Sequence, residues 1–254
     1  MSEIIKQRPN ILDYQTFVAS SRTKGIDDEN WKNIYSTLLK DELLEVFYQH
    51  GNGSKLLMPS GWFRSEEKNE DDEINYHMAD ELGDILWFSS DCAIRLGFSV
   101  IDACKKSVLV NNLTANQPVL SFMDIETAAL LNAKKIRVPN NSGLMLQNIP
   151  EEFRITSLSD NPFYVFIRLI SRLGKILNNG QVDSGPSTAT DFEPIQDAAE
   201  VIGSIIFSIS YIAKNRLGIS IEDIARFNIA KLKNRQSYGK ENDIVLNLDF
   251  LTNK

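Results

Sequence analysis

The sequence predicts an all-α protein built as a helical bundle, and three observations support this fold class. Apolar residues recur at helical spacing in each long segment of the chain. Glycines stand where these patterns stop, as they do at the C-termini of helices. No convincing sheet pattern is present, and only short extended pieces near residues 137–158 are expected.

The predicted helices follow one another with loops that are rich in glycine, proline and polar residues. The first long pattern ends at Gly51 and the second ends at Gly97. Ser99 is suited to cap the helix that follows, because its hydroxyl can accept a hydrogen bond from a free backbone N–H group. The predicted helices span residues 34–51, 76–97, 99–112, 162–180, 195–218 and 220–235, and the predicted irregular segments span 52–62, 136–161 and 180–190.

The composition is that of a globular protein and argues against several classes of partner. Hydrophobic residues make up 43% and charged residues 24% of the 254 residues. The net charge of −7 argues against binding to long nucleic acid, but a small phosphate ligand is compatible with it if a metal ion supplies positive charge. We find no membrane-spanning apolar run and no signal-peptide core, and therefore expect a cytoplasmic protein without a membrane partner. Cys92 and Cys104 are expected to be buried thiols.

An internal repeat is visible when the ends of the predicted helices are aligned. The segment RLGFSVIDAC, residues 95–104, matches RLGISIEDIA, residues 216–225. A weaker sequence similarity relates residues 38–47 to residues 169–177. Any two amphipathic helices look alike, but the shared RLG turn favours a true repeat. Offsets of two residues remain in the alignment of the two segments of the chain. We therefore predict two related halves: residues 1–116 and residues 117–254.

Two pairs of carboxylates lie on predicted helices among apolar neighbours. Glu42 and Glu45 are three residues apart, as are Glu81 and Asp84, so each pair lies on one helix face. Like charges at this spacing repel by about 0.2–0.5 kcal/mol when they are exposed. The cost rises to several kcal/mol, roughly, for a buried ion without a partner. A divalent cation offsets this cost, and oxygen ligands suit Mg²⁺, with Mn²⁺ as an alternative.

Other interpretations of these acids were weighed. A single Glu-x-x-Glu pair on a helix usually belongs to a solvent-exposed polar face, whereas two such pairs on two helices favour a metal site. Di-iron bundles also place carboxylates on facing helices, but they need a Glu-x-x-His motif. Neither His50 nor His77 has a glutamate three residues before it, which argues against a di-iron site.

Four motifs together resemble the MazG-like, all-α nucleoside triphosphate pyrophosphatases. They are LDYQTF at residues 12–17, Glu-x-x-Glu at 42–45, ELGD followed by an apolar helix at 81–84, and N-x-x-K-L-x-x-R at 228–235. The resemblance implies a helical bundle made by pairing such modules. It also implies hydrolysis of the α–β linkage of (deoxy)nucleoside triphosphates to monophosphate and pyrophosphate. The four acids Glu42, Glu45, Glu81 and Asp84 would then hold Mg²⁺ and be catalytic.

Each half departs from the family pattern in a different way. The second half has Arg172 and Lys175 where the first has Glu42 and Glu45, and its counterpart of Asp84 falls near Ser204 or Ile205. The first half lacks the N-x-x-K-L-x-x-R motif. We therefore expect a fused pseudo-dimer with one composite site, to which the first half supplies the acids and the second supplies phosphate-binding groups.

The resemblance also suggests roles for the remaining candidate residues. Lys231 and Arg235 would bind phosphate, and Asn228 would bind sugar or phosphate; the alternative is a solvated helix end. Asp41 is either a base near the metal or a surface acid, and Trp62 is a candidate to line the base pocket. A non-catalytic nucleotide sensor and a helical interaction module are the alternative functions, and a homodimer is possible.

Overall fold

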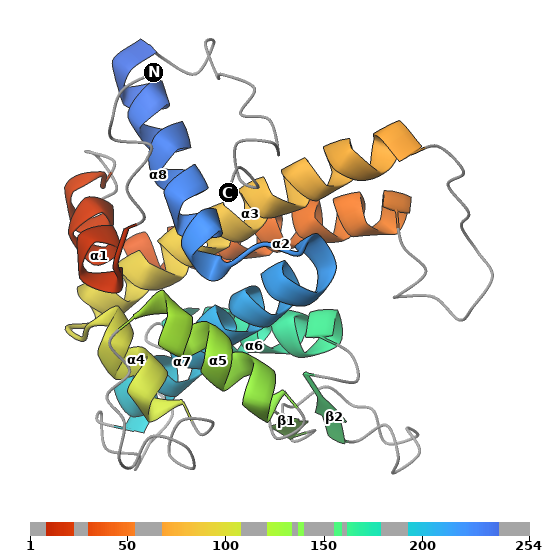
Figure 1. Ribbon diagram of the computed structural model, residues 1–254. Helices are drawn as coiled ribbons and strands as arrows, with labels where there is room; N and C mark the ends of the chain where they lie inside the picture. The colour runs from red at the N-terminus through yellow and green to blue at the C-terminus, as the bar shows by residue number, and fades with distance from the viewer. Residues whose placement is uncertain are drawn as a thin grey trace.

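The computed structural model shows a bundle of packed helices (Figure 1). It describes residues 9–22, 30–53, 68–107, 121–133, 137–139, 155–158, 162–178 and 193–238. The helices are α1 (Ile11–Ser20), α2 (Trp31–Gly53), α3 (Lys68–Arg95), α4 (Val100–Lys106), α5 (Phe122–Asn132), α6 (Pro162–Asn178), α7 (Glu193–Ile212) and α8 (Ile221–Tyr238), with a π-helical turn, η3 (Ala213–Leu217), after α7.

The predicted all-α class is confirmed for the described part of the chain. Its only strands there are β1 (Arg137–Pro139) and β2 (Ile155–Ser157), which form a short antiparallel ribbon beside α6. They lie within the stretch where short extended pieces were expected. The predicted loop at 180–190 and most of that at 52–62 lie outside the described residues.

The repeated RLG segment forms the same local structure twice. Gly97 and Gly218 both adopt positive φ angles, 88° and 69°, which glycine reaches without a Cβ penalty. The serine two residues later then caps the next helix. Ser99 shares a reciprocal pair of hydrogen bonds with Asp102, as predicted for its role as N-cap, and Ser220 does the same with Asp223.

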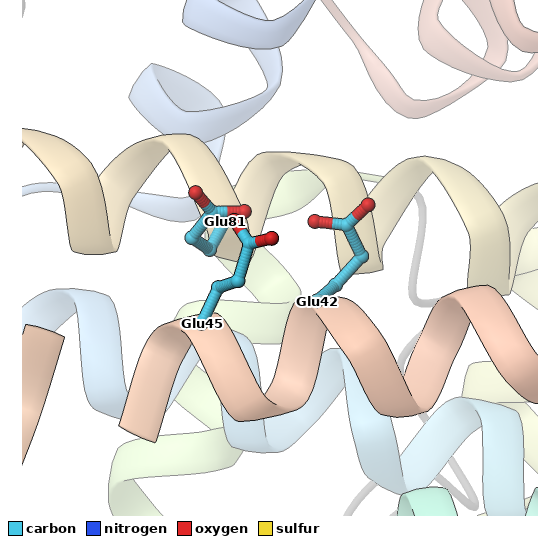
Figure 2. A group of neighbouring side chains, drawn as sticks. All are labelled: Glu42, Glu45 and Glu81. Carbon is cyan, nitrogen blue, oxygen red and sulfur yellow. The ribbon is translucent and has the colours of Figure 1, made fainter. Parts of the chain in front are cut away.

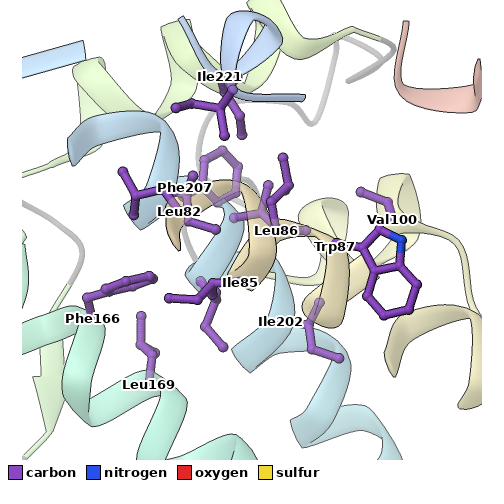
Figure 3. Packing of buried hydrophobic residues seen from close by; sticks show 14 of the residues in the cluster. Leu82, Ile85, Leu86, Trp87, Val100, Phe166, Leu169, Ile202, Phe207 and Ile221 are labelled. Atoms are coloured by element: carbon purple, nitrogen blue, oxygen red, sulfur yellow. The ribbon is translucent and has the colours of Figure 1, made fainter. Parts of the chain in front are cut away.

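The helices pack in two long pairs that contact each other. Helix α2 packs along α3, α6 packs along α7, and the pairs meet through contacts of α2 with α6 and of α3 with α7. The two helices that follow the repeated turns then cross over: α4 packs on α7, whereas α8 packs on α3. Figure 3 shows the apolar core where these elements meet, with Leu82 and Ile85 of α3 near Phe166 and Leu169 of α6. Chain segments far apart in sequence therefore build one core.

Two glycines allow the crossing helices to approach closely. A Cβ on Gly83 of α3 would lie 3.2 Å from the Cβ of Asn228 on α8. A Cβ on Gly203 of α7 would lie 2.2 Å from the carbonyl oxygen of Ala103 on α4, which is closer than atoms can approach. The crossing of α8 over α3 therefore brings the Asn228 side chain directly against the helix that carries Glu81.

A buried ionic cluster fixes α1, α2 and α3 against one another. The carboxylate of Asp91 on α3 is fully buried and accepts hydrogen bonds from Arg22, Tyr35 and Arg95, the last at 2.8 Å. The guanidinium of Arg95 also lies 5.4 Å from the ring centroid of Trp31. Because Tyr35 precedes Glu42 by seven residues on α2, this cluster lies about 10 Å along the helix from the acidic motif. It therefore sets the register between the two helices that carry the acids.

The described helices carry no segment long and apolar enough to cross a membrane. Cys92 and Cys104 are free, buried thiols, as predicted, and burial raises the pKa of Cys104 to about 12.

Candidate metal centre

Three of the four predicted acids meet between α2 and α3. One carboxylate oxygen from each of Glu42, Glu45 and Glu81 lies within 4.8 Å of the others. Figure 2 shows Glu42 and Glu45 rising from α2 toward α3, which carries Glu81. Glu81 is 8% exposed, Glu42 is half-buried and Glu45 is exposed. The cluster therefore has a buried inner side and one member open to solvent.

The environment holds a proton in this cluster when no cation is bound. Burial, the hydrogen bond to Glu42 and the neighbouring acids raise the pKa of Glu81 to about 10. Burial also raises the pKa of Glu42, although the hydrogen bond from Glu81 opposes this shift. Glu81 is therefore the protonated partner, and its carboxyl donates to the carboxylate of Glu42 at neutral pH.

The donor set fits a hard divalent cation. All three side chains offer carboxylate oxygens, which Mg²⁺ and Mn²⁺ prefer, and no sulfur or imidazole from the described part of the chain joins them. Two oxygens on one Mg²⁺ at about 2.1 Å lie at most about 4.2 Å apart. The observed limit of 4.8 Å thus needs only a small movement of flexible glutamate side chains.

Asp84 lies beside this cluster but is held by groups from α8. Its Oδ1 accepts a hydrogen bond from Nδ2 of Asn228 at 2.9 Å and one from Nζ of Lys231 at 2.6 Å. Lys231 also donates to Asp80. The structure therefore brings acids from the first half of the chain against Asn228 and Lys231 from the second half.

Lys231 keeps its charge in this buried position. The residue is 6% exposed, and burial alone would lower the pKa of its ammonium group, but the charges of Asp84 and Asp80 raise the pKa above its usual value. Burial raises the pKa of Asp84, whereas Lys231 lowers it. Asp80 is not among the residues predicted from the sequence, although it lies four residues before Asp84 and hence on the same helix face.

Tyr14 of α1 fixes the amide of Asn228. Its hydroxyl donates to Oδ1 of Asn228 at 3.2 Å, and both residues are fully buried. Burial, and then the charge of Asp84, raise the pKa of Tyr14 well above its usual value, so the hydroxyl stays protonated. The amide nitrogen of Asn228 consequently points at Asp84.

The other predicted site residues have different surroundings. Arg235 is partly buried one turn beyond Lys231, and its charge lowers the pKa of Asp84. Asp41 is exposed on α2, the setting expected of a surface acid. Trp62 lies outside the described residues.

A neutral counterpart of the Asp84–Asn228 contact lies at the other helix crossing. Ser204, which follows Gly203, contacts Ser107 of α4 through hydroxyl oxygens 2.9 Å apart. Gly218 follows Gly203 by 15 residues, whereas Gly97 follows Gly83 by 14. The π-helical turn η3, which precedes Gly218, accommodates one extra residue. This insertion accounts for part of the offset between the two repeated segments in the sequence alignment.

The chain was also compared with known proteins. A scan against protein-family models and searches of curated proteins and of solved structures find no match.

Proposed function

We propose that this protein is a Mg²⁺-dependent nucleoside triphosphate pyrophosphohydrolase, which releases pyrophosphate and a nucleoside monophosphate. One observation supports this function above the others. Three clustered carboxylates on α2 and α3 lie beside a buried lysine and asparagine from α8. The carboxylates can bind a cation and the lysine can bind phosphate, which are the two requirements of phosphoryl chemistry.

We further propose that the chain is a fused pseudo-dimer of two related halves. The crossing of α4 over α7 parallels the crossing of α8 over α3. Gly203 and Gly83 occupy these crossings, and the turns at Gly97 and Gly218 are alike. The polar pair at one crossing includes the charged Asp84, whereas the pair at the other is Ser107 with Ser204, so a single composite centre per chain is expected.

In this proposal Glu42, Glu45 and Glu81 hold the cation. When bound, Mg²⁺ supplies positive charge to the triphosphate and lowers the pKa of water. Lys231 and Arg235 bind phosphate oxygens and neutralise the charge that develops as the α–β linkage breaks. Asn228 orients Asp84 through its fixed amide. The nucleoside itself is held by residues that these contacts do not identify.

The test is pyrophosphate release from a panel of nucleoside triphosphates with Mg²⁺. Glu81→Gln keeps the size of the side chain and a hydrogen-bond donor but cannot become the carboxylate that binds the cation, so we expect it to abolish release. Glu126→Gln is the matched control, because Glu126 lies on α5 and its carboxylate pairs with Lys214 of η3 outside the centre. Nucleotide binding without release would instead support a non-catalytic sensor. Release that is unchanged in Glu81→Gln would contradict the proposed site.

A further inference from the structure

Asp84 is a candidate cation ligand that already has partners on another helix. The sequence motif places Asp84 among the cation ligands, yet its Oδ1 accepts hydrogen bonds from Lys231 and Asn228. Both of these donors come from α8 and both are buried. The ammonium group thus lies 2.6 Å from one oxygen of the carboxylate that a fourth ligand would have to supply.

Charge separates the two arrangements. A divalent cation on Asp84 would stand against the ammonium of Lys231, and these like charges repel strongly in a buried setting. Asp80 also binds Lys231, so the ammonium group bridges two carboxylates on one face of α3. While this bridge persists, a cation is restricted to Glu42, Glu45 and Glu81.

The two donors from α8 differ in their freedom to move. Asn228 is held between Asp84 and the hydroxyl of Tyr14, so its short side chain is fixed at both ends. Lys231 carries its charge on a flexible four-carbon stem that can swing to a new anion. An incoming phosphate group is such an anion, and its oxygens can replace both carboxylates as partners of the ammonium group.

We propose that Lys231 is a switch that withholds Asp84 from the cation until a triphosphate binds. The phosphate then takes Lys231 from Asp84 and Asp80, and Asp84 becomes the fourth cation ligand. This inference rests on the proposed function and deepens it. Triphosphate and cation consequently strengthen each other's binding, and this coupling is reciprocal.

The experiment measures the dissociation constant of Mn²⁺ alone by calorimetry on the nucleotide-free protein. The variants are Asp84→Asn, Lys231→Met, Glu81→Gln and the combinations of Lys231→Met with Asp84→Asn and with Asp80→Asn, each after its fold is verified by circular dichroism. Asp80→Asn is the matched control, because it removes the same charge one turn away on α3. If Lys231 affects Mn²⁺ binding only through its charge, replacing either aspartate should have the same effect. If Lys231 withholds a cation ligand, only replacement of Asp84 should matter.

We expect Asp84→Asn and Asp80→Asn to have equal, small effects while Lys231 is present. Lys231→Met should tighten Mn²⁺ binding roughly tenfold. Adding Asp84→Asn should remove this gain, whereas adding Asp80→Asn should leave most of it. The proposal is overturned if Asp84→Asn already weakens Mn²⁺ binding as much as Glu81→Gln does, or if the gain survives in Lys231→Met/Asp84→Asn.

A second measurement covers the case in which Lys231→Met does not fold. Asp84→Asn and Asp80→Asn are compared in the presence of inorganic triphosphate, which offers phosphate groups without a base. Asp84→Asn should now bind Mn²⁺ roughly tenfold more weakly than Asp80→Asn. Equal affinities would refute the switch. If pyrophosphate release depends on Glu81 but the switch is refuted, the proposed function still stands. If Mn²⁺ binds as expected but no pyrophosphate is released, the switch stands and the proposed function is refuted.

Discussion

Replacing Glu81 by glutamine should stabilise the metal-free protein at alkaline pH and flatten the pH dependence of its stability. Glu81 retains its proton in the folded protein because burial and the neighbouring Glu42 raise its pKa to about 10. In the unfolded chain a glutamate loses its proton near pH 4.3, roughly. Between these values the folded state binds one more proton than the unfolded state. Stability therefore falls as pH rises, by up to about 1.4 kcal/mol per pH unit.

The expected size follows from this slope. From pH 5 to pH 8 the loss is at most about 4 kcal/mol, and solvent around the exposed Glu45 reduces it to roughly 1–3 kcal/mol. For a chain of this length, 1 kcal/mol corresponds to about 2–4 °C in the melting temperature. Glutamine at position 81 keeps a donor for Glu42 but does not titrate. As the pH rises from 5 to 8, the melting temperature of Glu81→Gln should thus fall by several degrees less than that of the wild type.

Thermal unfolding followed by circular dichroism at pH 5, 6, 7 and 8 in EDTA measures this difference. Glu126→Gln serves as the control, since its carboxylate lies in a separate ion pair with Lys214. Excess Mg²⁺ should restore stability to the wild type at pH 8 and have little effect on Glu81→Gln, because ligands must be deprotonated to bind the cation. Parallel decreases for wild type and Glu81→Gln in EDTA would refute the assignment of the proton to Glu81.

Two further predictions concern the packing that positions the centre. Asp91→Asn removes the charge that Arg22 and Arg95 share in a buried site, so we expect a loss of about 3–5 kcal/mol in the free energy of unfolding, measured by urea denaturation; a loss below 1 kcal/mol, roughly, would show that the cluster is not needed. Gly203→Ala forces a Cβ against the carbonyl oxygen of Ala103 and should cost about 1–3 kcal/mol or more, whereas Gly83→Ala, with a gap of 3.2 Å, should cost less. The reverse order of the two alanine variants would contradict the packing at these crossings.

Local sequence signals were sufficient for the fold class and for the turn at Gly97, whereas α2 continues two residues past the end predicted at Gly51. Periodicity predicted α6 and most of α3, although α3 begins at Lys68 rather than at residue 76. The pairing of Gly97 with Ser99 predicted the turn and cap that the structure shows. Helix ends without such a signal were less accurate: α2 begins at Trp31, three residues before the predicted start. Contacts with other helices, rather than local propensity, decide such ends.

The site could be predicted only as far as chemistry follows from spacing along one helix. Glu42 and Glu45 share a face of α2 by their spacing, but their meeting with Glu81 depends on how α2 packs along α3. The contact of Asp84 with Lys231 joins residues 147 positions apart, and no local pattern reports it. Asp80 was missed for the same reason, since only its lysine partner distinguishes it from a solvated acid.

The contrast between the two helix crossings explains why the buried charges persist in one of them. Both crossings are closed by a glycine, and both place a polar pair where the helices meet. Ser107 and Ser204 show that a neutral pair satisfies the hydrogen bonds of such a crossing. The aspartates and lysine at the other crossing carry a desolvation cost that packing alone does not require, and buried ion pairs are often no more stabilising than neutral replacements. The proposed function needs these charges to bind phosphate and a divalent cation, and it would account for this asymmetry where packing does not.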